Sequence, residues 1–130
     1  EVALGFESGA PEVLRKMNKR YSPEEVARVA GLLRRHGIRR MGFLLLGGPA
    51  ETRDTVERRL AFADSLDLDL LRTTVGIRVY PGTALARRAV AEGLISEGED
   101  LLRPRFYLAP GLDEWLRERV QPGVHVRGRP

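Results

Sequence analysis

The chain has 130 residues, with 22 Lys and Arg against 18 Asp and Glu, a formal net charge of +4 and a hydrophobic content of 42%. These values are ordinary for one soluble globular domain, and no apolar stretch approaches the length of a transmembrane helix. The absence of cysteine excludes disulfides, thiolate metal sites and cysteine nucleophiles. The two histidines, His36 and His125, lie far apart in the sequence, so we expect no metal site.

The mild positive charge is spread over segments with helical patterns, which is typical of solvated helix faces. We therefore expect a cytoplasmic protein without a membrane partner and without a nucleic-acid partner. Residue 1 is not Met, so we also expect the chain to be part of a longer protein.

The first segment, Glu1–Ser8, predicts a β-strand because bulky apolar residues alternate with small residues and finally with Glu7. Pro11 suits the first turn of a short helix that reaches about residue 17. The run Ser22–Glu25 predicts the start of the next helix, with serine as N-cap, proline at the first helical position and a glutamate that closes a capping box. Gly37 predicts the end of that helix in a left-handed conformation.

An apolar run over Met41–Leu46 stops at a Gly-Gly-Pro sequence, which indicates a strand and excludes a longer helix. Helical patterns lie on both sides of it, so we expect a strand of a mostly parallel sheet that helices cover on both faces. Ligands of such sheets bind at the carboxyl ends of the strands, where Gly47–Glu51 would lie. Thr52 predicts the N-cap of a helix that extends to about Ser65.

A third strand is predicted over Leu71–Tyr80, followed by a helix that Thr83 caps and Gly93 ends. Residues 96–130 are expected to form an irregular extension with a short helix over Leu112–Val120 and a poorly ordered tail. One face of the third strand is polar and carries Arg72, Thr74, Gly76, Arg78 and Tyr80.

The order of these elements predicts an α/β fold with three consecutive parallel βα units. Such units can belong to an open sheet or to part of a barrel. The arginines of the third strand favour a barrel, because unpaired guanidinium groups are costly inside a packed helix layer but not on a wet, concave face. An edge position of this strand would also explain them. The outer edge of the first strand, Val2–Ser8, is expected to pair with another copy or to be covered by the tail.

The segments LGFESG, MNKRYSPEEV, LLLGGPAETRDTV, VYPGTAL and AEGLI occur in this order over about Val2 to Ile95. This succession resembles the second half of radical S-adenosylmethionine (SAM) enzyme cores, in the branch often found behind a cobalamin-binding domain. The resemblance implies a partial (β/α)6, TIM-like barrel, in which residues 1–95 supply the last three units. It also implies SAM as a cofactor, the rest of a parent chain as a partner, and a small-molecule substrate.

The resemblance assigns SAM-binding roles by motif. Glu7 and Ser8 match the pair that binds the ribose hydroxyls, and an ion pair of Glu7 with Arg78 or Arg72 is the structural alternative. Glu51 and Thr52 match an E-T pair that we interpret as a helix start. The residues that match the adenine and methionine side of the site are Gly42, Leu44, Leu46, Gly47, Arg78, Val79 and Tyr80.

The chain departs from the family because it lacks the three cysteines that hold the 4Fe–4S cluster and the glycine-rich segment that binds the SAM amine. We therefore expect these residues to be inactive alone, as the C-terminal portion of a parent enzyme that uses SAM, a 4Fe–4S cluster and cobalamin. One alternative is a small α/β module that binds an anion or nucleotide at the Gly47–Gly48 turn and the helix start at Thr52. Another is a half-domain that folds only by self-association.

Overall fold

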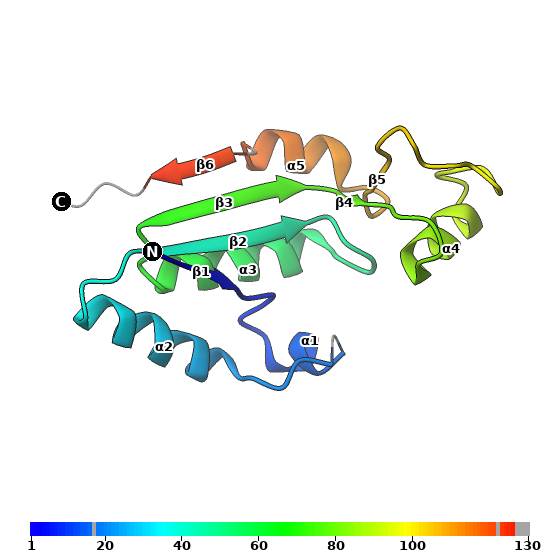
Figure 1. Cartoon of the computed structure of the whole chain (residues 1–130). Helices are drawn as coiled ribbons and strands as arrows, with labels where there is room; N and C mark the ends of the chain where they lie inside the picture. Colours follow the sequence, from blue (N-terminus) through cyan, green and yellow to red (C-terminus); the bar gives the residue numbers. More distant parts are fainter. Residues whose placement is uncertain (17, 122, 127–130) are drawn as a thin grey trace.

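The computed structural model describes residues 1–16, 18–121 and 123–126. None of the helices within these ranges is long and apolar enough to cross a membrane. In chain order the elements are β1 (Val2–Gly5), α1 (Pro11–Lys16), α2 (Pro23–Arg35), β2 (Arg40–Leu46), α3 (Arg53–Ser65), β3 (Leu70–Val75), β4 (Ile77–Arg78), α4 (Ala84–Ala91), β5 (Phe106–Tyr107), α5 (Asp113–Arg119) and β6 (Gly123–Val126) (Figure 1).

The main sheet has the strand order β1-β2-β3-β6. β1, β2 and β3 are parallel, which confirms the predicted α/β class, whereas β6 is antiparallel to β3. The expectation of an unstructured tail is therefore wrong for Gly123–Val126, and residues 127–130 lie outside the described ranges. The tail covers the edge of β3 rather than that of β1, whose pairing within the described chain is with β2 alone.

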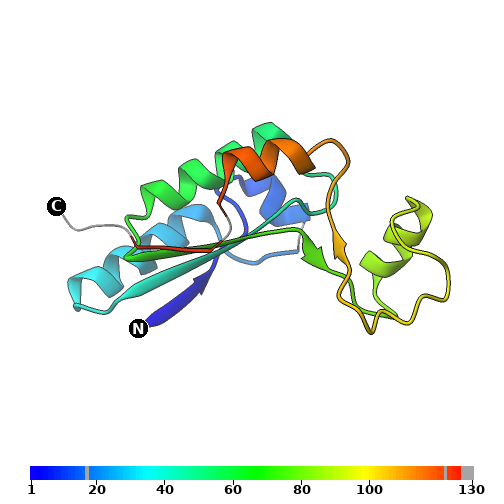
Figure 2. The ribbon, with the colours of Figure 1, turned by 90° about the horizontal axis from the view of Figure 1, so that it is seen from above.

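Helices cover one face of the sheet, and the other face is open (Figure 2). The expectation that both faces are covered is wrong, because consecutive right-handed crossovers place α2 and α3 on the same side. β2 shows the asymmetry directly. Its residues Arg40, Gly42, Leu44 and Leu46 are buried, while Leu45 on the opposite face is 48% exposed. We call the uncovered side the open face.

The predicted helix starts are confirmed by their hydrogen bonds. The Ser22 hydroxyl accepts from the Glu25 N–H and the Glu25 carboxylate from the Ser22 N–H, as a capping box requires. Thr52 caps α3 by accepting from the Thr55 N–H, and Thr83 caps α4 in the same way. These starts depend on neighbours in sequence, which explains why local patterns predicted them.

The predicted third strand ends early, at Val75, because Gly76 has φ +82° and its N–H donates to the Leu46 carbonyl at 2.8 Å. The chain then turns into β4, which pairs antiparallel with β5 in a separate two-stranded ribbon. The expectation of one continuous strand to residue 80 is therefore wrong. So is the expectation of irregular structure at residues 106–107, since Tyr107 is a fully buried member of β5.

The buried hydroxyl of Tyr107 leads us to expect that the chain loses folding stability at alkaline pH. Its hydroxyl donates to Glu92 Oε2 at 2.8 Å. Burial raises the pKa of this phenol above its usual 10.0, and the bonded Glu92 carboxylate raises it further. A raised pKa in the folded state means that the contribution is complete below pH 10.0 and disappears as pH rises through the folded pKa. Tyr107→Phe should therefore cost about 1 kcal/mol at neutral pH and reduce the alkaline loss.

Urea unfolding followed across neutral and alkaline pH tests this expectation. Tyr80→Phe is the matched control, because Tyr80 is 54% exposed and should leave the alkaline loss in place. An undiminished alkaline loss in Tyr107→Phe would contradict the assignment.

Candidate functional site on the open face

The strand register arranges the side chains of the open face in rows. Gly5, Phe43 and Arg72 form one row, and the row before it contains Ala3, Met41 and Leu70. Toward the carboxyl ends, Leu45 pairs with Thr74. The Arg72 guanidinium lies over the Phe43 ring, 5.8 Å from its centroid. The open face is thus apolar or small except for polar groups contributed by β3 and by the segment after β1.

Glu7 lies at the carboxyl end of β1, between two residues that point to the helices. Phe6 and Ser8 are each 2% exposed, whereas the Glu7 side chain is 26% exposed. Its Oε1 lies 3.3 Å from the Lys19 Nζ, and this ion pair replaces the predicted pair with Arg78 or Arg72. Sequence reasoning missed Lys19, although the residue stands in the MNKRY segment that carries the family resemblance.

Ser8 begins the turn into α1. Its buried hydroxyl accepts a hydrogen bond of 3.0 Å from the Ala10 N–H. The Ser8 side chain is therefore buried at the start of this turn, whereas the Glu7 side chain is 26% exposed. The side chains of Glu7 and Ser8, which the resemblance pairs at the ribose, thus differ in exposure, and their joint binding of a ribose stays a prediction.

The central-strand residues expected beside adenine belong to the core. Leu44 is 1% exposed and Leu46 is 0% exposed. A Cβ on Gly42 would lie 2.5 Å from Leu68 Cδ1 and 2.9 Å from Phe6 Cε1, so this glycine allows close packing on the helix side. The expected apolar wall of Gly42, Leu44 and Leu46 therefore lies in the core on the helix side of the sheet. The strand period of two places their neighbours Met41, Phe43 and Leu45 on the open face instead.

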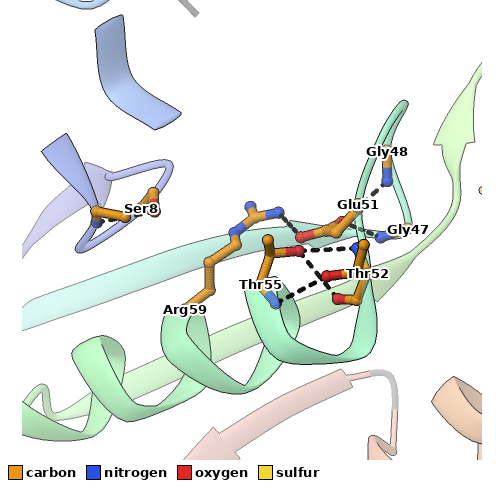
Figure 3. A network of polar contacts seen from close by, with 8 residues as sticks. Ser8, Gly47, Gly48, Glu51, Thr52, Thr55 and Arg59 are labelled. Carbon is orange, nitrogen blue, oxygen red and sulfur yellow. Dashed lines mark hydrogen bonds and ion pairs between the residues drawn. The ribbon is translucent and has the colours of Figure 1, made fainter. Parts of the chain in front are cut away.

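The turn between β2 and α3 is held by Glu51 (Figure 3). Its Oε2 accepts from the N–H groups of Gly47, at 2.6 Å, and Gly48, at 3.0 Å. Its Oε1 lies 2.5 Å from the Arg59 Nη1 on α3. Thr52 is the N-cap, as predicted, but the prediction gave Glu51 no partner. We call these contacts the Glu51 network.

Burial makes the Glu51 network an internal structure rather than a ligand site. The side chains of Glu51 and Arg59 are 6% and 11% exposed. Successive backbone N–H groups that converge on one point form a position for an anion, and the Glu51 carboxylate occupies it here. This arrangement disfavours the anion-binding module that the sequence left as an alternative.

The last group of expected site residues begins at Arg78 on β4 and continues through Val79 and Tyr80, beyond the carboxyl end of β3 (Figure 2). Val79 is buried at 2% exposure, while Tyr80 is exposed and has the Arg78 guanidinium 5.0 Å from its ring centroid. The break at Gly76 removes this segment from the sheet. Within the described chain, no contact brings Arg78 together with Glu7.

Comparison with known proteins connects this geometry to a family. Residues 1–63 match the model of the Radical SAM superfamily. An uncharacterized methyltransferase of Pyrococcus horikoshii is 33% identical over 94 residues, which are 72% of this chain and 20% of that protein. The chain belongs to the radical SAM superfamily. The heme chaperone HemW of Mycobacterium tuberculosis is 32% identical over 108 residues, which are 82% of this radical SAM chain and 27% of HemW.

Solved structures of the radical SAM methyltransferase TsrM from Kitasatospora setae share the fold. The structure with cobalamin and a 4Fe–4S cluster has a TM-score of 0.60 and 27% identity, covering 69% of this chain and 18% of TsrM. The structure with tryptophan substrate and a SAM analogue has a TM-score of 0.65 and 20% identity, covering 89% and 29%. The similarity confirms the predicted relation to the radical SAM TIM-like barrel. The radical SAM chain spans less than a third of these relatives.

The relation to a barrel indicates whether the open face corresponds to the interior or the exterior of such a barrel. In TIM-like barrels the helices form the outer ring and the other face of the strands lines the interior. The helices α2 and α3 lie outside in this sense (Figure 2), so the open face of the radical SAM chain corresponds to the interior face.

Proposed function

We propose that this chain is the C-terminal half of the core barrel of a longer radical SAM enzyme, with residues 96–130 as an extension, and that its open face supplies the ribose side of the SAM site. The observation that carries the proposal is the position of Glu7. Its carboxylate follows the carboxyl end of β1, is 26% exposed, and lies beside the ammonium group of Lys19.

The chemistry of a carboxylate suits this role. The ribose of SAM carries two neighbouring hydroxyl groups, and a carboxylate can accept a hydrogen bond from each. The ion pair of 3.3 Å with Lys19 restricts the rotation of Glu7, so the carboxylate is positioned before a ligand arrives. Lys19 therefore acts as a positioning residue in this proposal.

The remaining cofactors belong to the parent protein. When bound, the 4Fe–4S cluster supplies the electron for reductive cleavage of SAM, and this chain has no cysteine to hold it. The cluster ligands must therefore come from the rest of the parent. We include cobalamin among the parent's cofactors because a similar TsrM structure contains it.

The rest of the parent chain is also the partner that we propose for β1. The outer edge of β1 is unpaired in the described part of the chain, and a parallel strand placed there would extend the barrel. Pairing of this edge with a second copy is the alternative, and it would appear as a dimer of the 130-residue chain in solution.

Binding of S-adenosylhomocysteine to the longer protein tests the proposal by calorimetry, without requiring catalysis. Glu7→Ala should weaken binding about tenfold or more, because both ribose hydroxyls lose their acceptor. Lys19→Met should weaken it less, since the carboxylate remains but is no longer positioned. Glu12→Ala, at a half-exposed residue of α1 that pairs with Arg58, is the matched control and should bind normally. Unchanged affinity in Glu7→Ala would reject the ribose assignment and leave only the family and fold.

A further inference from the structure

Arg72 is the charged residue within the paired rows of the open face. Its row contains Gly5 on β1 and Phe43 on β2, and the adjoining positions Met41, Leu45 and Leu70 are apolar. Arg72 is exposed, and no ion pair of its guanidinium is found within the described ranges. A cation therefore stands in the middle of an apolar interior face.

The surroundings of Arg72 leave space for a flat group. A Cβ on Gly5 would meet no atom within 4 Å, so the row is open beside the Phe43 ring. The guanidinium lies over the ring, 5.8 Å from its centroid. The next residue of β3 on this face, Thr74, has a buried Oγ1 without a hydrogen-bond partner among the described residues. Gly5 thus leaves a gap, Phe43 presents an aromatic ring, and Arg72 presents N–H donors that have no acceptor among the described residues.

If the parent's barrel encloses the open face, the Arg72 guanidinium needs an anion in place of its hydrating water. An exposed guanidinium is hydrated, but one in a barrel interior loses water and is costly unless an anion replaces it. The planar guanidinium matches a carboxylate through two parallel N–H···O bonds, and an aromatic ring stacks on another flat group. The guanidinium and the ring together favour a ligand that carries both a carboxylate and a flat group.

We propose that Gly5, Phe43 and Arg72 form a subsite for a substrate that is an aromatic or heteroaromatic carboxylate. The flat part of the substrate lies over Gly5 against Phe43, and its carboxylate pairs with Arg72. The proposal rests on the proposed function for the position of this face inside the parent's barrel, and it goes further by naming the substrate class.

The chain contains a matched control for this arrangement. Arg53 on α3 lies 5.6 Å from the ring centroid of Trp115 on α5, which is also an arginine–aromatic pair. This pair lies on the helix side of the sheet, outside the barrel interior (Figure 2). It carries the same chemistry without the enclosure, so ligand binding should distinguish the two pairs.

NMR titration of the longer protein, in which the barrel encloses the open face, with benzoate and with benzamide as the uncharged analogue tests the subsite. Benzoate should shift the Arg72 Nε–H and Phe43 ring signals saturably and bind about tenfold more tightly than benzamide. Arg72→Gln should abolish this difference, and Arg53→Gln should preserve it. Phe43→Leu should weaken both ligands, which provides a second variant if Arg72→Gln disturbs the fold.

Several results would overturn the proposal. These are equal binding of benzoate and benzamide, shifts centred on Arg53 and Trp115, and an unaltered preference in Arg72→Gln. In the longer protein, Arg72→Gln should leave binding of S-adenosylhomocysteine unchanged. A loss there would assign Arg72 to the carboxylate of SAM itself, and a loss of thermal stability would assign it to an acidic side chain of the parent. Failure of Glu7→Ala to affect S-adenosylhomocysteine would reject the ribose assignment alone.

Discussion

Glu51→Ala is expected to destabilise the chain by about 3–5 kcal/mol, which is the range for removing one partner of a buried ion pair. The substitution leaves the Arg59 charge buried at 11% side-chain exposure without its carboxylate. It also removes the acceptor of the Gly47 and Gly48 N–H groups. Since Arg59 Nε is already buried without a hydrogen-bond partner in the described chain, the guanidinium has little other compensation.

Urea unfolding of single and double variants separates the parts of the Glu51 network. Glu51→Gln keeps an acceptor for the two amides, so it should cost less than Glu51→Ala. Arg59→Met combined with Glu51→Ala should cost less than the sum of the single changes, because the uncompensated charge is gone. Glu57→Ala removes a carboxylate whose pair with Arg119 is half exposed, and it should cost less than about 1 kcal/mol.

Equal effects of Glu51→Ala and Glu57→Ala would contradict the structural role assigned to Glu51. If Glu51→Ala instead remained stable and acquired affinity for inorganic phosphate, the emptied turn would behave as an anion site. That result would show that the anion-binding capacity of the glycine turn exists and that Glu51 normally blocks it.

Gly47→Ala is expected to cost about 3 kcal/mol, for two reasons that add. Gly47 has φ +92°, which is strained for any residue with a Cβ. The new Cβ would also overlap Leu108 Cδ1 and lie 3.4 Å from Leu116 Cδ1. The peptide cannot rotate away readily, because its N–H donates to Glu51 and its carbonyl accepts from the Ala109 N–H at 2.8 Å.

Gly82→Ala separates the two contributions. Gly82 has φ +75°, but a Cβ there would meet no atom within 4 Å. Its substitution should therefore show the backbone strain alone, about 1 kcal/mol. Thermal unfolding of both variants gives the difference, which reports the packing of Leu108 against the end of β2. A Gly82→Ala effect as large as that of Gly47→Ala would attribute the whole cost to φ.

Sequence alone determined the elements whose causes are local. The caps at Ser22, Thr52 and Thr83 depend on side chains that bond to residues three positions away, and the structure confirms each. The parallel α/β class followed from the order of strands and helices. The family followed from several short segments in a fixed order, which local motifs can carry without any knowledge of packing.

Tertiary structure decided which side chains share a face and which meet across the chain. Leu44 and Leu45 are equally apolar in sequence, yet one is buried under helices and the other is 48% exposed, because the crossovers cover only one face. Glu7 meets Lys19 rather than an arginine of the predicted third strand. Gly76 turns Arg78 out of the sheet, and β2 separates Arg72 on β3 from β1.

The same distinction explains the β2–α3 turn. Its sequence allowed either a helix start or an anion site, and the position of Arg59 on the second turn of α3 decided between them. Hydrogen bonds within a few residues are encoded locally. Burial and ion pairing depend on the position of every element at once, so only the folded chain could show that the glycine turn is filled by its own glutamate.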